Sequence, residues 1–261
     1  MEVQLNKMKT SLEEVVDYQL NSGEVSIDMN ALVGHHIHMR YQGKQQCAAC
    51  GGFKKLFAQG FCYNCFTKAP EASPCIIRPE VCEGHLGKGR DVKWEEENHV
   101  QPHFVYLAVA SSLKIGVTRA TQIPTRWIDQ GASYAIKVAE TPYRKIAGDI
   151  EVALKGTFTD KTNWRSMLKN EIAAIELEDE KWQIEELLPM DLAEYMTEDD
   201  EIIHIEYPVL TFPDKVKSLN FDKQEVVEGK LLGIKGQYLL LDNDRVINLR
   251  KHKGYYVDFE Y

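Results

Sequence analysis

The secondary-structure pattern of the central part of this chain is clearest in FVYLAVASSLKIGVTRATQIPTRWIDQGASYAIKVAETPYRKIAGDIEVALKGTFTDKTNW, residues 104–164. It opens with two apolar runs, 104–110 and 113–117, which are separated only by two serines. Two short apolar runs joined by so few residues are the pattern of a β-hairpin. We therefore expect two antiparallel strands at the start of this stretch.

A helix, a third strand and a second helix follow in the pattern of the next forty residues. The first helix begins at about Pro124, the strand covers 135–139 and the second helix covers 143–155. The second helix has one apolar face, because residues four positions apart lie on the same side of a helix. The residues of this face are Ile146, Ile150 and Leu154.

This order of elements resembles the GIY-YIG nuclease domain. The resemblance is carried by Val105-Tyr106-Leu107, Lys114-Ile115-Gly116-Val117-Thr118, Arg126-Trp127, Glu151 and Asn163-Trp164. It implies an α/β sandwich with a shallow cleft. It also implies that the protein acts as an endonuclease on DNA or RNA. Its implied catalytic residues are Tyr106, Lys114 (in place of the family's second tyrosine), Arg126, Glu151 and Asn163. The cysteine cluster followed by VYLA, KIG, RW and QGA also resembles a prokaryotic family known only as a domain of unknown function.

Each implied residue has a chemical reason to be there. Glu151 would bind one Mg²⁺ or Mn²⁺ ion, and magnesium is often held by only one or two carboxylates plus substrate phosphate. Arg126 offers a planar, permanently charged fork for phosphate oxygens. Tyr106 would need a nearby cation such as Lys114 to lower its pKa from about 10 before it could act as a base. The alternative for each is an ordinary place on a strand, helix or turn.

A cluster of cysteines precedes this stretch. Cys47, Cys50, Cys62 and Cys65 form the pattern C-x2-C-x11-C-x2-C. Four thiolates in two such pairs close a tetrahedral site, which is typical of structural zinc. A redox pair is the alternative. Cysteines used in this way suit a reducing cytosol, so we expect a cytoplasmic protein.

A second metal site is suggested by Cys75, Cys82 and His85, in the pattern C-x6-C-x2-H. Its fourth ligand would come from His99 or His103. The alternative is two ordinary cysteines beside a turn histidine.

Charge is divided unevenly along the chain, whose net charge is −9. Residues 44–145 hold 14 basic and 9 acidic side chains, whereas residues 171–206 hold 1 basic and 14 acidic ones. Affinity for nucleic acid needs local cations, so we expect it in the first of these segments. No run of about 18 apolar residues occurs, so we expect no membrane-spanning segment.

The patterns predict an α+β protein built from a zinc ribbon, the central GIY-YIG-like α/β sandwich and a β-rich part from both chain ends. A helix is expected over 165–188 and a short one over 192–196. Residues 12–18 read as strand or as a short helix. The predicted divisions are 1–43 (N-terminal strands), 44–103 (cysteine module), 104–170 (GIY-YIG-like), 171–200 (acidic helical segment) and 201–261 (a small barrel-like region).

Three functions remain open at this point. The first is a divalent-metal-dependent endonuclease-like protein acting on DNA or RNA. The second is a zinc-containing nucleic-acid-binding module in which Lys114 records the loss of catalysis. The third is a zinc-stabilised scaffold that contacts other proteins.

Overall fold

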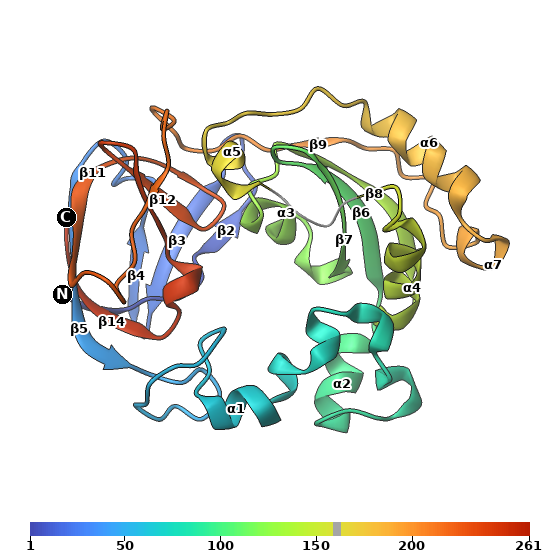
Figure 1. Ribbon diagram of the computed structural model, residues 1–261, viewed down its shortest axis with the longest axis horizontal. Coiled ribbons are helices and arrows are strands. Elements are labelled where there is room, and N and C mark those ends of the chain that lie inside the picture. The colour runs from blue at the N-terminus through green and yellow to red at the C-terminus, as the bar shows by residue number, and fades with distance from the viewer. Residues whose placement is uncertain (159–162) are drawn as a thin grey trace.

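The computed structural model describes residues 1–158 and 163–261, so residues 159–162 of the predicted 104–170 domain lie outside the described residues. Within the described part the chain forms a mixed α+β structure with three sheets, which confirms the predicted class. Figure 1 shows the strands of the two chain ends on one side, the central sheet with its helices on the other, and the cysteine-rich segment along a third side.

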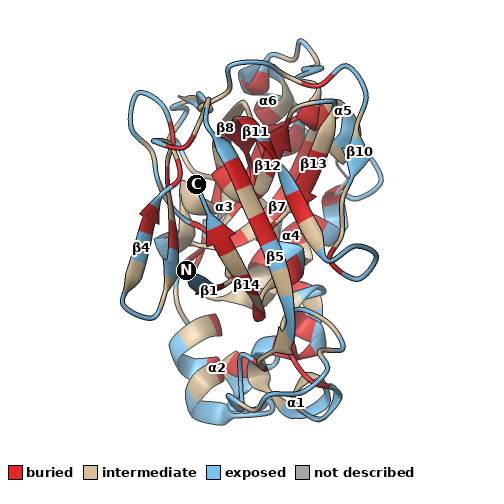
Figure 2. Ribbon diagram, turned by 90° about the vertical axis from the view of Figure 1, so that its left-hand side faces the viewer, coloured by how far each residue is buried: buried red, intermediate tan, exposed pale blue. Residues whose placement is uncertain are grey.

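The largest sheet mixes strands from both ends of the chain. Its order is β1-β14-β5-β11-β12-β13-β10, and its neighbours are antiparallel except for β10 and β13. Alternate residues of β5 and β14 are buried, as expected for a sheet with one face on a core (Figure 2). The strands are β1 Glu2–Gln4, β5 His36–Gln45, β10 Lys217–Ser218, β11 Val226–Lys235, β12 Tyr238–Leu241, β13 Arg245–Asn248 and β14 Tyr255–Glu260.

A small second sheet covers part of this core. It consists of β2 (Lys9–Ser11), β3 (Asp17–Ser22) and β4 (Val25–Asp28) in that order. Residues 12–18 form no helix, and only 17 and 18 belong to a strand, since 12–16 are an irregular connection between β2 and β3. Tyr18 and Leu20 of β3 are fully buried in the core that the large sheet shares.

The central sheet has the order β7-β6-β8-β9 and is antiparallel throughout. The predicted hairpin is formed by its first two strands. Strand β6 is buried on both faces, and its alternate residues enter two separate cores: Val105 and Leu107 pack with helix α4, whereas Tyr106 packs with the terminal strands. The strands are β6 His103–Val109, β7 Leu113–Arg119, β8 Tyr134–Thr141 and β9 Ile203–His204.

Helices α3 (Thr125–Asp129) and α4 (Arg144–Leu154) occupy the predicted positions. The turn η5 (Ala120–Gln122) precedes α3. In α4, Ile150 and Leu154 are buried against the central sheet, and Ile146 is half-buried beside the same core. On another side of α4, Gly148 lies against the cysteine-rich segment.

The helix predicted over 165–188 is wrong, since the structure has two helices there. Helix α5 (Trp164–Leu168) stops at Lys169, and α6 spans Leu177–Leu187. Asn170, with φ of 59°, ends α5 in the left-handed conformation that asparagine tolerates at this position. The following helix α7 spans Met190–Ala193 instead of 192–196.

The cysteine-rich segment contains little regular structure. Helices α1 (Tyr63–Lys68) and α2 (Val92–His99) are joined by 3-10 helices, and the first three of these begin with proline, which suits a helix start. They are η1 Pro70–Ala72, η2 Pro74–Ile76, η3 Pro79–Val81 and η4 Gly84–Leu86; a further one, η6, spans Arg250–His252 near the C-terminus. Among the described helices none is long and apolar enough to cross a membrane.

Candidate active-site cleft and metal centres

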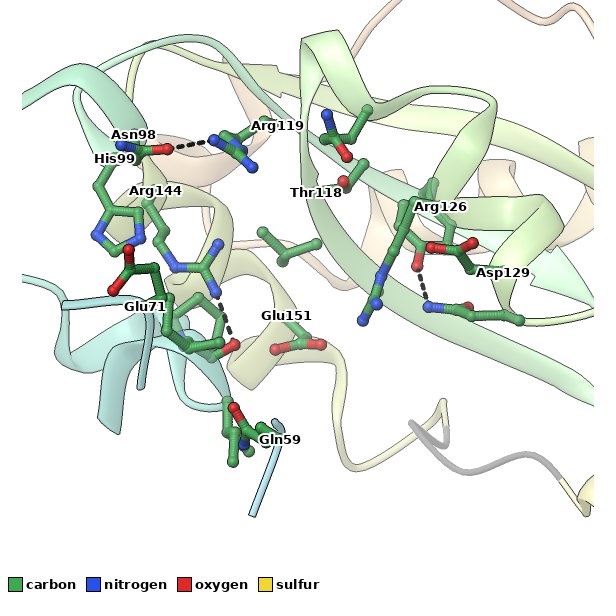
Figure 3. A pocket seen from close by; sticks show the side chains of 18 of the residues that line it. Gln59, Glu71, Asn98, His99, Thr118, Arg119, Arg126, Asp129, Arg144 and Glu151 are labelled. Atoms are coloured by element: carbon green, nitrogen blue, oxygen red, sulfur yellow. Dashed lines mark hydrogen bonds between the residues drawn. The ribbon is translucent and has the colours of Figure 1, made fainter. Parts of the chain in front are cut away.

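A cleft of about 700 Å³ lies where three parts of the chain meet. Strands β6 and β7 and helices α3 and α4 supply one side, and the cysteine-rich segment supplies another through η2, η3 and α2. Arg250 and Lys253 reach it from the connection between β13 and β14. Figure 3 shows Arg126, Arg144 and Glu151 around this space.

Four of the five predicted catalytic residues line the cleft: Tyr106, Lys114, Arg126 and Glu151, from β6, β7, α3 and α4. Asn163 is not among the lining residues. It is the N-cap of α5, where its Oδ1 accepts hydrogen bonds from the backbone N–H groups of Arg165 (3.2 Å) and Ser166 (3.3 Å). Such a cap satisfies donors that a helix start leaves without partners. The position of Asn163 is therefore explained by the fold.

Tyr106 is fully buried, and its hydroxyl accepts a hydrogen bond from Gln130 Nε2 at 2.8 Å. The opposite residue on β7 is Gly116, where a Cβ atom would lie 2.6 Å from the Tyr106 oxygen, so a glycine is needed there. Burial raises the pKa of Tyr106, and Arg126 opposes that rise only in part. The lowered pKa that a base would need is thus absent, and the phenol is protonated at neutral pH.

Glu151 is a buried carboxylate on the inner side of α4, with 8% of its surface exposed. Lys155 Nζ lies 3.9 Å from its Oε2, one helical turn away. At the start of the same helix Arg144 donates from Nε to the carbonyl of Cys75 and from Nη2 to that of Ile76, both at 3.0 Å. Burial lowers the pKa of Arg144, and the nearby Cys75 opposes the change. Helix α4 thus carries a carboxylate and a guanidinium to one cleft.

The cleft has an excess of positive charge. One of its cations, Lys7, pairs with the buried Asp129 at 2.7 Å. Arg119 donates to Asn98 across the boundary between β7 and α2, as Figure 3 shows. The lining cations are Lys7, Lys114, Arg119, Arg126, Arg144, Arg250 and Lys253, against the acids Glu71, Asp129 and Glu151. This excess is notable in a chain whose net charge is −9, because it concentrates cations where an anion could enter.

The predicted cysteines converge. Cys47, Cys50, Cys62 and Cys65 place their sulfurs within 4.8 Å of one another, a set that could hold structural zinc. Burial raises the pKa of Cys47, but backbone N–H groups of Cys50, Cys62 and Ala49 outweigh it and bring the value down to about 6. A thiolate stabilised in this way is the form that binds metal. The arrangement is compatible with a zinc ribbon.

A second group forms from Cys75, Cys82, Glu95 and His99, all buried and with ligand atoms within 4.8 Å of one another. His85, which the sequence pattern favoured, is outside this group and stacks on the Tyr143 ring at 4.5 Å. His103, the alternative fourth ligand, is also outside it. The group therefore contains Glu95 in the place that the prediction gave to His85.

Glu95 was missed because the search followed cysteine and histidine spacing. Glu95 and His99 are four residues apart on α2, so both side chains point to the same face. That spacing within a helix just after two cysteines is the signal that could have found this pair.

Comparison with known proteins identifies the family. A family model described as "Protein of unknown function (DUF2797)" matches residues 34–257. The chain belongs to this family. The result confirms the resemblance to a family of unknown function. Searches of curated proteins and of solved structures returned no match.

The DUF2797 match contains every residue of the cleft except Lys7, and all of both metal-ligand groups. It begins within the segment that precedes β5 and leaves out strands β1 to β4. The cleft and both groups of ligands therefore lie almost wholly within the DUF2797 region of this chain.

Proposed function

We propose that the cleft binds the phosphate backbone of DNA or RNA and hydrolyses a phosphodiester bond with a divalent metal ion. In this proposal β6, β7, α3, β8 and α4 form a divergent GIY-YIG-like unit. The observation that carries it is the convergence of Tyr106, Lys114, Arg126 and Glu151, from four elements, on one cleft.

The charge of the cleft supports a polyanionic substrate. Cations reach it from the central unit, from the N-terminal segment and from the connection between β13 and β14. Neutralisation of phosphates by lysine and arginine supplies most of the affinity of proteins for nucleic acids that is independent of sequence. A single phosphate would need fewer cations than these, so an extended backbone fits better.

In this proposal each of these residues has a separate role in the reaction. Glu151 would hold Mg²⁺ or Mn²⁺ together with a substrate phosphate, and the ion would supply positive charge at the phosphoryl group. Arg126 would hold phosphate oxygens in a fixed, planar orientation. Tyr106, protonated because burial raises its pKa, would donate a hydrogen bond and not accept a proton. Asn163 has no part in this scheme.

The test is cleavage of labelled DNA and RNA by zinc-loaded protein with and without Mg²⁺ or Mn²⁺. We expect Glu151→Gln to lower the cleavage rate by about 10²-fold or more, because the cation loses its protein ligand. Asp149→Asn is the matched control: it lies on the same helix, pairs with Lys145 at 2.8 Å and does not line the cleft. Cleavage by Glu151→Gln at the rate of the wild type would refute the assignment.

One observation favours a second function, a binding module without catalysis. Lys114 stands where the GIY-YIG family has its second tyrosine. The remaining tyrosine, Tyr106, is a buried phenol with a raised pKa. The same experiment separates the functions. Binding of oligonucleotides without cleavage in any metal would select the binding module, whereas no binding even at low salt would select the protein-contacting scaffold.

A further inference from the structure

We propose that Cys75, Cys82, Glu95 and His99 hold a second zinc ion, which fixes one wall of the cleft against helix α4. The geometry and burial of the four ligands point to the ion. Its role at the wall of an active cleft rests on the proposed function.

The distances from the two cysteine sulfurs to the histidine nitrogen match tetrahedral coordination. The Sγ atoms of Cys75 and Cys82 lie 3.8 and 3.6 Å from His99 Nδ1. Zinc–sulfur and zinc–nitrogen bonds of about 2.3 and 2.0 Å at a tetrahedral angle place the two ligand atoms about 3.5 Å apart. Glu95 Oε2 is in direct contact with the same nitrogen, so these two atoms would move apart to hold an ion between them. Two thiolates, an imidazole and a carboxylate are ligands that suit zinc.

Burial of these four ligands favours a bound cation. The exposed fractions are 7% for Cys75, 2% for Cys82, 2% for Glu95 and 3% for His99. A carboxylate and two thiols gathered in so dry a place would repel one another once ionised, and burying charge without compensation is costly. A dication removes that cost because it binds all of these groups at once.

The four ligands leave no coordination position open, which marks a structural role, and only His99 of the four also borders the cleft. At Gly89 a Cβ atom would lie 2.4 Å from Glu95 Cγ, and at Gly84 a Cβ atom would lie 3.4 Å from the Cβ atoms of both Glu95 and His99. The loop between these glycines therefore lies directly on the ligands. The rings of Trp94 and His99 pack in a T-shaped arrangement with their centroids 5.0 Å apart. Catalytic zinc sites keep one open position, and this group has none.

The same segment is joined to α4. Arg144 binds the carbonyls of Cys75 and Ile76, and Gly148 lies so near η3 that a Cβ atom would be 2.2 Å from the backbone nitrogen of Glu80. Ile76, Ile77 and Pro79 line the cleft that faces Glu151. Since η2 and η3 are single turns, the ion would supply most of the constraint that holds this wall in place.

Metal analysis of the purified chain tests the ion. We expect two zinc ions per wild-type chain, and one in Cys82→Ser and in Glu95→Gln. The zinc that remains in these variants, at Cys47, Cys50, Cys62 and Cys65, shows that this part of the chain is still folded. His85→Gln is the matched control, and we expect it to keep two. One zinc per wild-type chain would overturn the proposal, and so would loss from His85→Gln with retention in Glu95→Gln.

Hydrogen exchange tests the effect on the wall. Removal of the second ion by Glu95→Gln should raise amide exchange in residues 144–154 of α4 and leave exchange in β11 unchanged. Equal exchange of α4 in both proteins would overturn the role in positioning. Neither readout depends on cleavage, so a protein with two zinc ions and no nuclease activity would refute the proposed function and leave the metal site standing.

Discussion

The imidazole of His103 is buried without solvent contact at the start of β6. Its Nδ1–H donates to the carbonyl of Gln101 at 2.7 Å, whereas its buried Nε2 has no partner among the described residues. Burial is the main reason why the pKa of His103 falls from 6.5 to about 3, and the positive charges of Arg144 and Arg119 add to this fall. The folded protein therefore holds this histidine in its neutral form.

This lowered pKa predicts acid sensitivity. Below pH 6.5 the unfolded chain binds a proton at His103 that the folded chain does not bind, so stability is complete above that pH and falls as the pH drops toward 3. From pH 7 to pH 5.5 the loss from this group is about 1 kcal/mol. Urea unfolding at both pH values measures it.

The control for this effect is His103→Asn, whose amide can keep the hydrogen bond to Gln101 and does not titrate. We expect the variant to lose about 1 kcal/mol less than the wild type over the same pH interval. An equal loss in both proteins would show that His103 does not cause the acid sensitivity.

For single residues, the sequence predicts a place in the site where a local pattern sets the direction of the side chain. It misses residues whose place depends on tertiary contacts. Tyr106 and Glu151 reach the cleft because strand alternation and helix periodicity point them there. The raised pKa of Tyr106 depends on burial by the terminal strands, which no pattern in residues 104–164 contains. The exchange of His85 for Glu95 has the same origin, since it depends on how α2 packs against the cysteines.

Helix α4 and the turn η3 are in such close contact that one methyl group decides their spacing. Gly148 on α4 faces the backbone of Pro79 and Glu80, and a Cβ atom there would lie 2.5 Å from the Pro79 carbonyl carbon. Backbone atoms cannot move aside as the end of a side chain can. The helix tolerates a glycine in its interior because this contact requires one.

Gly148→Ala should therefore destabilise the protein although alanine is the better helix former. The gain in helix propensity is about 1 kcal/mol, whereas overpacking against backbone costs about 1–3 kcal/mol. We expect a net loss of about 1 kcal/mol or more in urea unfolding. Val152→Ala, at an exposed position of the same helix, should change stability by no more than about 0.5 kcal/mol. A stabilised Gly148→Ala protein would contradict the close contact.

Elements with a strong periodic pattern were predictable, and their ends were not. The hairpin β6–β7, the strand β8 and the helix α4 follow from apolar spacing. The helix expected over 165–188 failed because apolar residues continue at helical spacing through a segment where Asn170 breaks the helix. A pattern of side chains does not report such a change in backbone conformation.

The cleft is a property of the whole molecule, because no single part of the chain encloses it. Lys253 comes from the segment before β14, and its side chain lies over the Phe61 ring of the cysteine ribbon, with Nζ 5.7 Å from the ring centre. Gly60 leaves room for it, since a Cβ atom there would lie 2.9 Å from Lys253 Cδ. One lysine thus joins the C-terminal strands, the ribbon and the cleft.

Lys253→Gln should weaken the binding of nucleic acid without changing its sequence preference. Loss of one phosphate contact is expected to reduce the slope of log affinity against log salt by about 1. Fluorescence anisotropy of a labelled oligonucleotide from about 50 to about 200 mM salt measures this slope. Lys230→Gln is the control, because Lys230 is exposed on β11 and outside the cleft. Equal slopes for the wild type and Lys253→Gln would exclude this contact.

The position of β14 between β1 and β5 sets a delay during synthesis. Both neighbours have left the ribosome once residue 45 has emerged, but the strand that pairs with them begins at Tyr255. At about 5–20 residues per second, roughly 10 to 40 seconds pass before it arrives. During that interval β1 and the edge of β5 that faces β14 lack their partner, and the other edge of β5 lacks its own until β11 is synthesised; unpaired strand edges attract other chains. We expect the risk of aggregation to be set by this waiting time more than by the stability of the finished sheet.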